Sequence, residues 1–287
     1  MKAVYERELR SYFNNMTGYI FIAFMLLFAG IFMTVLNLKN GYPNFEYALS
    51  NMTFIYLIII PVLTMRAIAE ERRQRTDQLL YSLPMGMTNV VLGKYFAMLT
   101  VLAVPVVIMA LYPLLLGMYG TVQYQSAYAA LLGYFFMGAG LIAVGLFISS
   151  VTDNQAIAAV ITLIVLLVNY YLPTLTYYVT TSTGAAIVIF TVIAVLVGII
   201  TGVMTKNAVF AVVIGSVCEI GAIIFTVLSQ TAAQSLIPKL MGNISLFARY
   251  NSFVNGIFDL NAIVFYLMVG AVFVFLTVQS LEKRRWS

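Results

Sequence analysis

The chain has 287 residues, of which 62% are hydrophobic and only 9% are charged, and its mean hydropathy is +0.99. These values exclude an ordinary soluble domain, in which about 45–50% of residues are apolar. One cysteine and no histidine argue against a disulfide framework, a metalloenzyme and a Cys/His hydrolase. The formal net charge of +5 is small and follows from membrane orientation, as argued below, so we expect no nucleic-acid partner.

Residues 2–17 have an apolar face and a polar face. When the side chains are placed about 100° apart, as in a helix, the apolar ones fall in one sector and the charged ones fall opposite. This pattern predicts an amphipathic helix that lies in the membrane interface; the alternative is a short solvated lead-in to the first span. The apolar face consists of Tyr5, Leu9, Tyr12, Phe13 and Met16.

Several apolar runs reach the roughly 18–20 residues that a helix needs to cross a bilayer. None alternates between apolar and polar residues as the strands of a membrane barrel do. The sequence therefore predicts an all-α polytopic membrane protein with about eight transmembrane helices. We expect them at residues 19–36, 48–65, 95–119, 128–151, 156–179, 185–204, 208–228 and 262–278.

Residues 66–94 separate the second and third spans and hold eight of the 25 charged side chains. Within them, Thr76 is suited to cap a short helix, Asp77 lies in its first turn, and Pro84 ends it. Leu79, Leu80 and Leu83 give this helix an apolar face. A short helix held between two spans can serve as a lever that a partner grips. The alternative is a solvated loop whose charges only fix the topology.

The distribution of lysine and arginine predicts the orientation. With the N-terminus inside, 12 of the 15 basic residues lie on the inner side, and Lys39, Lys239 and Arg249 lie outside. The positive-inside rule therefore predicts two cytoplasmic termini and an even number of spans. Residues 230–260 are then extracellular, and we expect interfacial or partly inserted helices there.

Three acidic residues elsewhere stand beside or within apolar runs. Asp153 and Asp259 each precede an apolar helix and are expected to cap it. Glu219 lies near the middle of span 208–228, where a charge costs about 2.5–3.5 kcal/mol. It either faces a partner or wet cavity, or it is a packing residue with Ser216 one turn away.

Recognisable catalytic motifs are missing. Gly93-Lys94 is followed by Tyr95 and has the wrong upstream spacing for a phosphate-binding loop. The chain contains neither a GxSxG nucleophile elbow nor an HExxH motif. We therefore expect a protein that is not itself an enzyme and that binds no cofactor.

Several segments resemble permeases of the ABC-2 family, and in particular the gliding-motility-type branch. They are LTMRAIAEERR (63–73), TDQLLYSLP (76–84), VLGK (91–94), SSVTDNQ (149–155), SLFARYNSFVNG (245–256), DL (259–260) and LEKRRW (281–286). The chain departs from the family in two places. Arg75 stands where members often have glycine, and residues 185–228 form an extra hairpin relative to six-span members.

The resemblance implies that residues 1–287 form one permease domain of an exporter-like ABC transporter in the inner membrane of a prokaryote. Residues 2–17 would be an elbow helix and residues 66–94 a coupling region beneath the membrane. A separate ATPase dimer would bind ATP and magnesium, and a second permease copy would complete the transporter within the membrane lipid. The coupling residues implied are Glu70, Glu71, Thr76, Asp77, Leu79, Leu80, Leu83 and Pro84.

Two other functions are compatible with the residues. An ion-driven secondary transporter would use Glu219 as a proton site, although no similarity between the halves of the chain supports the inverted repeats of such proteins. A membrane scaffold that anchors an ATPase without transporting would carry the same coupling region.

Overall fold

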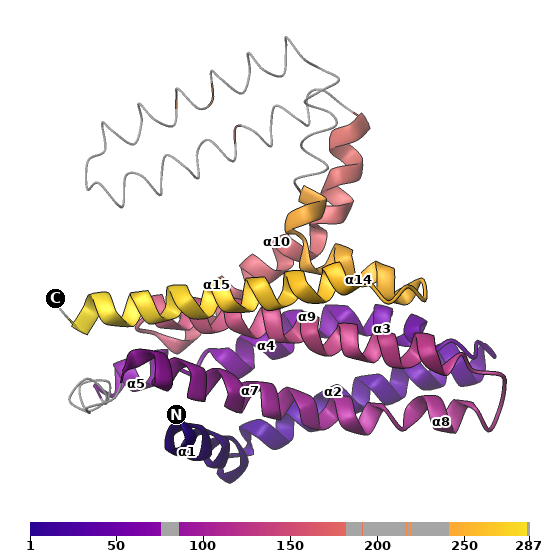
Figure 1. Ribbon diagram of the computed structural model, residues 1–287, viewed down its shortest axis with the longest axis horizontal. Coiled ribbons are helices and arrows are strands. Elements are labelled where there is room, and N and C mark those ends of the chain that lie inside the picture. Colours follow the sequence, from indigo (N-terminus) through magenta and orange to yellow (C-terminus); the bar gives the residue numbers. More distant parts are fainter. Residues whose placement is uncertain (76–85, 182–190, 192–215, 217–218, 220–240, 286–287) are drawn as a thin grey trace. The chain divides into compact units, whose positions relative to one another are not determined.

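The computed structural model describes residues 1–75, 86–181, 191, 216, 219 and 241–285. In this part of the chain every regular element is a helix (Figure 1), which confirms the all-α fold. The first elements are α1 (Lys2–Asn14), α2 (Met16–Phe32), the π-helical η1 (Met33–Lys39), α3 (Phe45–Met52), η2 (Thr53–Ile55), α4 (Tyr56–Thr64) and α5 (Ala69–Arg73). The later ones are α7 (Met87–Met109), α8 (Tyr112–Leu116), α9 (Tyr124–Val151), α10 (Gln155–Thr181), α14 (Leu246–Val254) and α15 (Leu260–Arg285).

Six stretches of the described residues are long and apolar enough to cross a membrane. They are Met16–Lys39, Phe45–Arg73, Met87–Leu116, Tyr124–Val151, Gln155–Leu175 and Leu260–Arg284. Each overlaps a predicted span, so the polytopic character of the chain is confirmed. The third begins at Met87 rather than at Tyr95, so the last eight residues of the predicted coupling region are the first turns of α7. The predicted spans 185–204 and 208–228 lie almost wholly outside the described residues, and the total of eight stays a prediction.

The sequence predicted one continuous helix for the third span, but the structure divides it into two. Helix α7 ends at Met109 and α8 begins at Tyr112, with Pro113 at the start of α8. Proline has no N–H to donate and is accepted best in the first turn of a helix. The chain therefore restarts its helix just before Pro113.

The chain forms two units, residues 1–170 together with 249–287, and residues 171–248. In the first unit the long helix α9 packs against α15, α7, α4 and α3 (Figure 1). Glycines permit the close approach: a Cβ at Gly138 would lie 2.7 Å from Leu102 and 2.8 Å from the Tyr56 hydroxyl. A Cβ at Gly133 would lie 2.7 Å from the ring of Phe253. Small residues thus let bulky neighbours reach the backbone of α9.

Aromatic side chains join the helices at the centre of this unit through ring stacking and hydrogen bonds. The rings of Tyr56 and Tyr134 stack with their centroids 4.4 Å apart, and the Tyr56 hydroxyl donates to the Tyr134 carbonyl at 3.0 Å. The Tyr250 hydroxyl donates to the Ala130 carbonyl at 3.3 Å. Because Tyr250 and Phe253 are fully buried, this part of the predicted extracellular segment packs against the helices of the first unit.

The amphipathic N-terminal helix is present as α1, and Val4 and Tyr12 are its buried residues. The prediction was wrong for Met16, which starts α2 and is 78% exposed. Helix α1 ends at Asn14, and Asn15 has an extended backbone between the two helices. That break rotates Met16 away from the apolar face of α1.

Candidate functional site

Four charged side chains form a closed ring at one end of the first unit. Arg7 Nη2 donates to Glu8 Oε1 at 2.9 Å and to Glu71 Oε1 at 3.0 Å. Lys94 Nζ donates to the same two oxygens, at 2.9 Å and 2.8 Å. Positive and negative groups therefore alternate around this charge ring, which joins α1, α5 and the first turns of α7.

The local sequence explains why α1 lies close enough to take part. Val4, Glu8 and Tyr12 are spaced four residues apart and share one side of α1. At Gly93, a Cβ would lie 3.0 Å from the side chain of Val4, so the glycine admits α1 against α7. The Tyr12 hydroxyl donates to the Leu63 carbonyl at 3.3 Å. These contacts hold Glu8 beside Lys94.

Burial makes the ring energetically important. The side chain of Lys94 is only 2% exposed, and those of Glu8 and Glu71 are 13% and 19% exposed. Burial disfavours the ionised form of Glu8, but the positive charges of Lys94 and Arg7 outweigh it and hold the pKa of Glu8 below its ordinary value. Removing one partner of a buried ion pair typically costs about 3–5 kcal/mol, because the other charge stays buried.

A second charged group lies next to the ring, and its carboxylate is much more exposed than those of the ring. Arg284 Nη1 of α15 donates to Asp153 Oδ1 at 2.8 Å, and Arg72 Nη1 lies 3.5 Å from the same oxygen. The side chain of Asp153 is 71% exposed. The hydrogen bond from Arg284 contributes most to lowering the pKa of Asp153. We call Arg72, Asp153 and Arg284 the exposed cluster after its carboxylate, since the side chain of Arg72 is only 3% exposed; it joins α5, the turn after α9, and the end of α15.

One of the two helix caps predicted from the sequence is wrong. Asp153 does not cap α10, because its carboxylate binds the two arginines of the exposed cluster. The cap comes from the next residue, since the Ala156 N–H donates to Asn154 Oδ1 at 2.9 Å. Asp259 does cap α15, because the Asn261 N–H donates to Asp259 Oδ1 at 2.9 Å. The turn after α9 directs Asp153 toward two arginines, and a charge-assisted bond is stronger than a neutral one.

Ser149 secures the break between α4 and α5. Its hydroxyl accepts the N–H groups of Ile68 and Ala69 at 3.2 Å and 3.1 Å, and lies 3.4 Å from the Met65 carbonyl, to which it donates. These N–H groups begin α5 and have no carbonyl of their own helix to bind. A fully buried side chain of α9 therefore caps the helix that carries Glu71 and Arg72.

Arg75 ends the described part of the coupling region in an uncommon conformation. Its φ is +56°, in the left-handed region, and its N–H donates to the Arg72 carbonyl at 3.0 Å. This position follows the end of α5, where glycine is strongly favoured because it has no Cβ. The backbone thus gives a physical reason for the glycine that the resemblance led us to expect here.

The structure places some of the predicted coupling residues and not others. Glu71 is in the charge ring, and the half-buried Glu70 accepts a hydrogen bond from Gln74 Nε2 at 3.3 Å. Glu219 is helical, half-buried and part of the second unit. The remaining predicted coupling residues, Thr76, Asp77, Leu79, Leu80, Leu83 and Pro84, lie outside the described residues.

Sequence reasoning missed Arg7, Glu8, Lys94 and Ser149. The only local signal was a lysine that follows glycine directly inside an apolar stretch. Among the residues that the structure describes, no cluster of acidic or cysteine side chains is suited to hold a metal ion.

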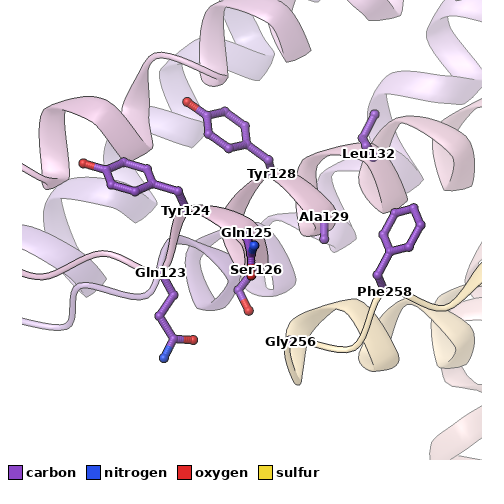
Figure 2. Close-up of a pocket in the computed structure, with 9 residues that line it drawn as sticks. All are labelled: Gln123, Tyr124, Gln125, Ser126, Tyr128, Ala129, Leu132, Gly256 and Phe258. Carbon is purple, nitrogen blue, oxygen red and sulfur yellow. The ribbon is translucent and has the colours of Figure 1, made fainter.

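A hollow of about 870 Å³ opens at the other end of the first unit, between the start of α9 and the turn after α14. Figure 2 shows Tyr124 and Tyr128, one turn apart on α9, with Gly256 and Phe258 on the segment that follows α14. Gly256 has φ +78°, and a Cβ there would lie 2.7 Å from Ser126 Oγ. The described residues that line the hollow include no carboxylate or cation, so they suit neutral polar and aromatic contacts.

The sequence model of a family described as ABC-2 family transporter protein matches residues 5–179. The match covers more than half of the chain and includes every residue of the charge ring. It ends before the hairpin expected at residues 185–228. A comparison with curated proteins found no match.

Proposed function

The chain belongs to the ABC-2 family of transporter proteins, and from this premise we propose that it couples ATP hydrolysis in a separate ATPase to movement of a substrate across the membrane. Family membership makes it a multi-pass permease subunit of an ABC transporter, a class that works with an ABC ATPase. ATP and magnesium would be bound by that ATPase. A second permease copy beside it would complete an exporter of the gliding-motility-type branch.

The observation that carries this proposal is the ion pair between Glu71 and Lys94, at 2.8 Å. Glu71 stands five residues before the coupling segment, residues 76–84, and Lys94 stands ten residues after it. The pair closes the base of the segment, and Arg7 and Glu8 fasten this base to α1. A force on the coupling segment would therefore reach α4, α7 and α1 together. A loop with free ends would absorb the same force by changing its own conformation.

The positions of α1 and of the end of α15 indicate that both lie on the same side of the membrane. Glu8 of α1 lies by Glu71, and Arg284 near the end of α15 lies by Asp153, which also pairs with Arg72. Because Glu71 and Arg72 are consecutive, α1 and the end of α15 share one end of the first unit (Figure 1). With the excess of basic residues on this side, we place both termini in the cytoplasm of a prokaryote.

Cross-linking in native membranes tests this function. The only native cysteine, Cys218, is replaced by serine, and Leu80→Cys then carries a photoactivatable thiol reagent. The captured protein should contain an ATP-binding cassette, and capture should change when ATP is added. The matched control is Tyr119→Cys, whose position is 81% exposed near the other end of the first unit. Capture of the ATPase at neither position, or equally at both, would contradict the proposal.

A further inference from the structure

A narrow apolar groove of about 300 Å³ runs between α2 and α4. Its floor contains Phe21, Ile59 and Leu63, which are at most 5% exposed. Its rims include Ile20 and Ile58, which are 59% and 48% exposed. Since α2 and α4 each belong to a stretch that is long and apolar enough to cross a membrane, Met16–Lys39 and Phe45–Arg73, this groove faces the membrane interior.

One end of the groove is polar and positively charged. Arg66 and Thr17 line that end, and Arg66 Nη1 donates to Thr17 Oγ1 at 3.3 Å. Thr17 is in the first turn of α2, and Arg66 follows the end of α4. The guanidinium is therefore held at the mouth of the groove, at the level where the apolar segments end.

The dimensions restrict what can lie in the groove. From Thr17 to Phe24 the helix rises by about 10 Å, which is the length of the upper part of an acyl chain. The groove is therefore long enough for the upper part of one acyl chain, with the headgroup end of the lipid beside Arg66.

We propose that this groove binds one acidic phospholipid, with an acyl chain between α2 and α4 and its phosphate paired with Arg66. The guanidinium fork matches two phosphate oxygens. A headgroup with a net negative charge is favoured over a zwitterionic one, because the latter brings an ammonium group toward Arg66. The site is separate from the coupling mechanism proposed above and stands if that mechanism fails.

Native mass spectrometry of the full-length chain, titrated with phosphatidylglycerol and then with phosphatidylcholine, tests the headgroup. Phosphatidylglycerol should bind first and more tightly. Arg66→Gln should weaken its binding about fivefold, in line with about 1 kcal/mol for a basic residue near an acidic lipid. The matched control Arg73→Gln removes an exposed charge that does not line the groove, and it should leave the affinity unchanged. Equal loss in both variants, or equal binding of the two lipids, would overturn the proposal.

A second pair of variants tests the acyl chain. Ile20→Trp fills the groove, whereas Leu27→Trp adds the same bulk at a position of α2 that is 57% exposed and lies outside the groove. Only Ile20→Trp should displace the lipid. If Ile20→Trp instead leaves lipid binding intact and separates a dimer into monomers, a second copy of the chain covers the groove and the proposal is wrong.

Discussion

The charge ring and the exposed cluster differ mainly in how deeply their carboxylates are buried. Both hold α5 to its surroundings through consecutive residues, Glu71 in the ring and Arg72 in the cluster. The carboxylates of Glu8 and Glu71 are 13% and 19% exposed, whereas that of Asp153 is 71% exposed. Each group also contains one buried cation, Lys94 at 2% and Arg72 at 3%. Buried charges are weakly screened and costly to leave without a partner, while exposed pairs contribute little. The ring should therefore govern stability and the cluster should only adjust it.

The largest effect is expected from Lys94→Met, which leaves the largely buried carboxylates of Glu8 and Glu71 with Arg7 as their one remaining cation in the ring. We expect a loss of about 3–5 kcal/mol in the free energy of unfolding, measured by denaturation in detergent with circular dichroism. Lys39→Met removes an exposed lysine at the end of η1 and should cost almost nothing. Because the ring residues contact each other, Lys94→Met with Glu71→Gln should cost less than the two single changes added. Additive costs would show that the ring is not a unit.

Acid should weaken the ring through Glu8. The pKa of Glu8 is lowered below its ordinary value of 4.5, so the unfolded chain binds a proton more readily than the folded one. The stability from this group is therefore complete above about pH 4.5 and is lost as the pH falls through the lower folded pKa. Between pH 7 and pH 3, the free energy of unfolding of Glu8→Gln should depend less on pH than that of the unchanged chain. In the control Glu6→Gln, which changes an exposed residue of α1, the pH dependence should be retained.

Asp153→Asn should have a smaller effect than Lys94→Met, because the side chain of Asp153 is 71% exposed and that of Lys94 is 2% exposed. Exposed ion pairs are worth about 0–1 kcal/mol and are screened by salt. The cost should be within that range at low salt and should shrink in 0.5 M sodium chloride, whereas the cost of Lys94→Met should change little. A cost for Asp153→Asn that exceeds that of Lys94→Met would reverse the comparison.

The smallest effect, and one in the stabilising direction, is expected from Arg75→Gly. A left-handed conformation strains a residue that has a Cβ, and glycine at this position after a helix relieves it. Part of the gain is offset by the greater freedom of glycine in the unfolded chain. We expect a gain of about 0.5 kcal/mol in the same denaturation assay. Arg73→Gly, inside α5, should instead destabilise by about 1 kcal/mol.

The sequence predicted the spans well because hydrophobic length is a local property. The starts of α2 and α15 each lie within about three residues of the predicted ones. The ring was not predictable in this way, since Lys94 is 86 residues from Glu8 and 23 from Glu71. Only the packing of α1 on α7 brings them together. Likewise, nothing around Ser149 indicated that its hydroxyl would cap α5, because its partners lie 80 and 81 residues away.

The most direct test of the central claim is how much ATPase copurifies with the chain when the apolar face of the coupling segment is removed. In Leu79→Ala with Leu80→Ala, a few buried anchors are lost from the proposed contact, and such anchors each cost more than about 1 kcal/mol. We expect at least a tenfold loss of bound ATPase, with folding unchanged. Leu27→Ala with Leu38→Ala, two exposed positions on α2 and η1, should retain it. Full retention of the ATPase by the Leu79 and Leu80 variant would contradict the account.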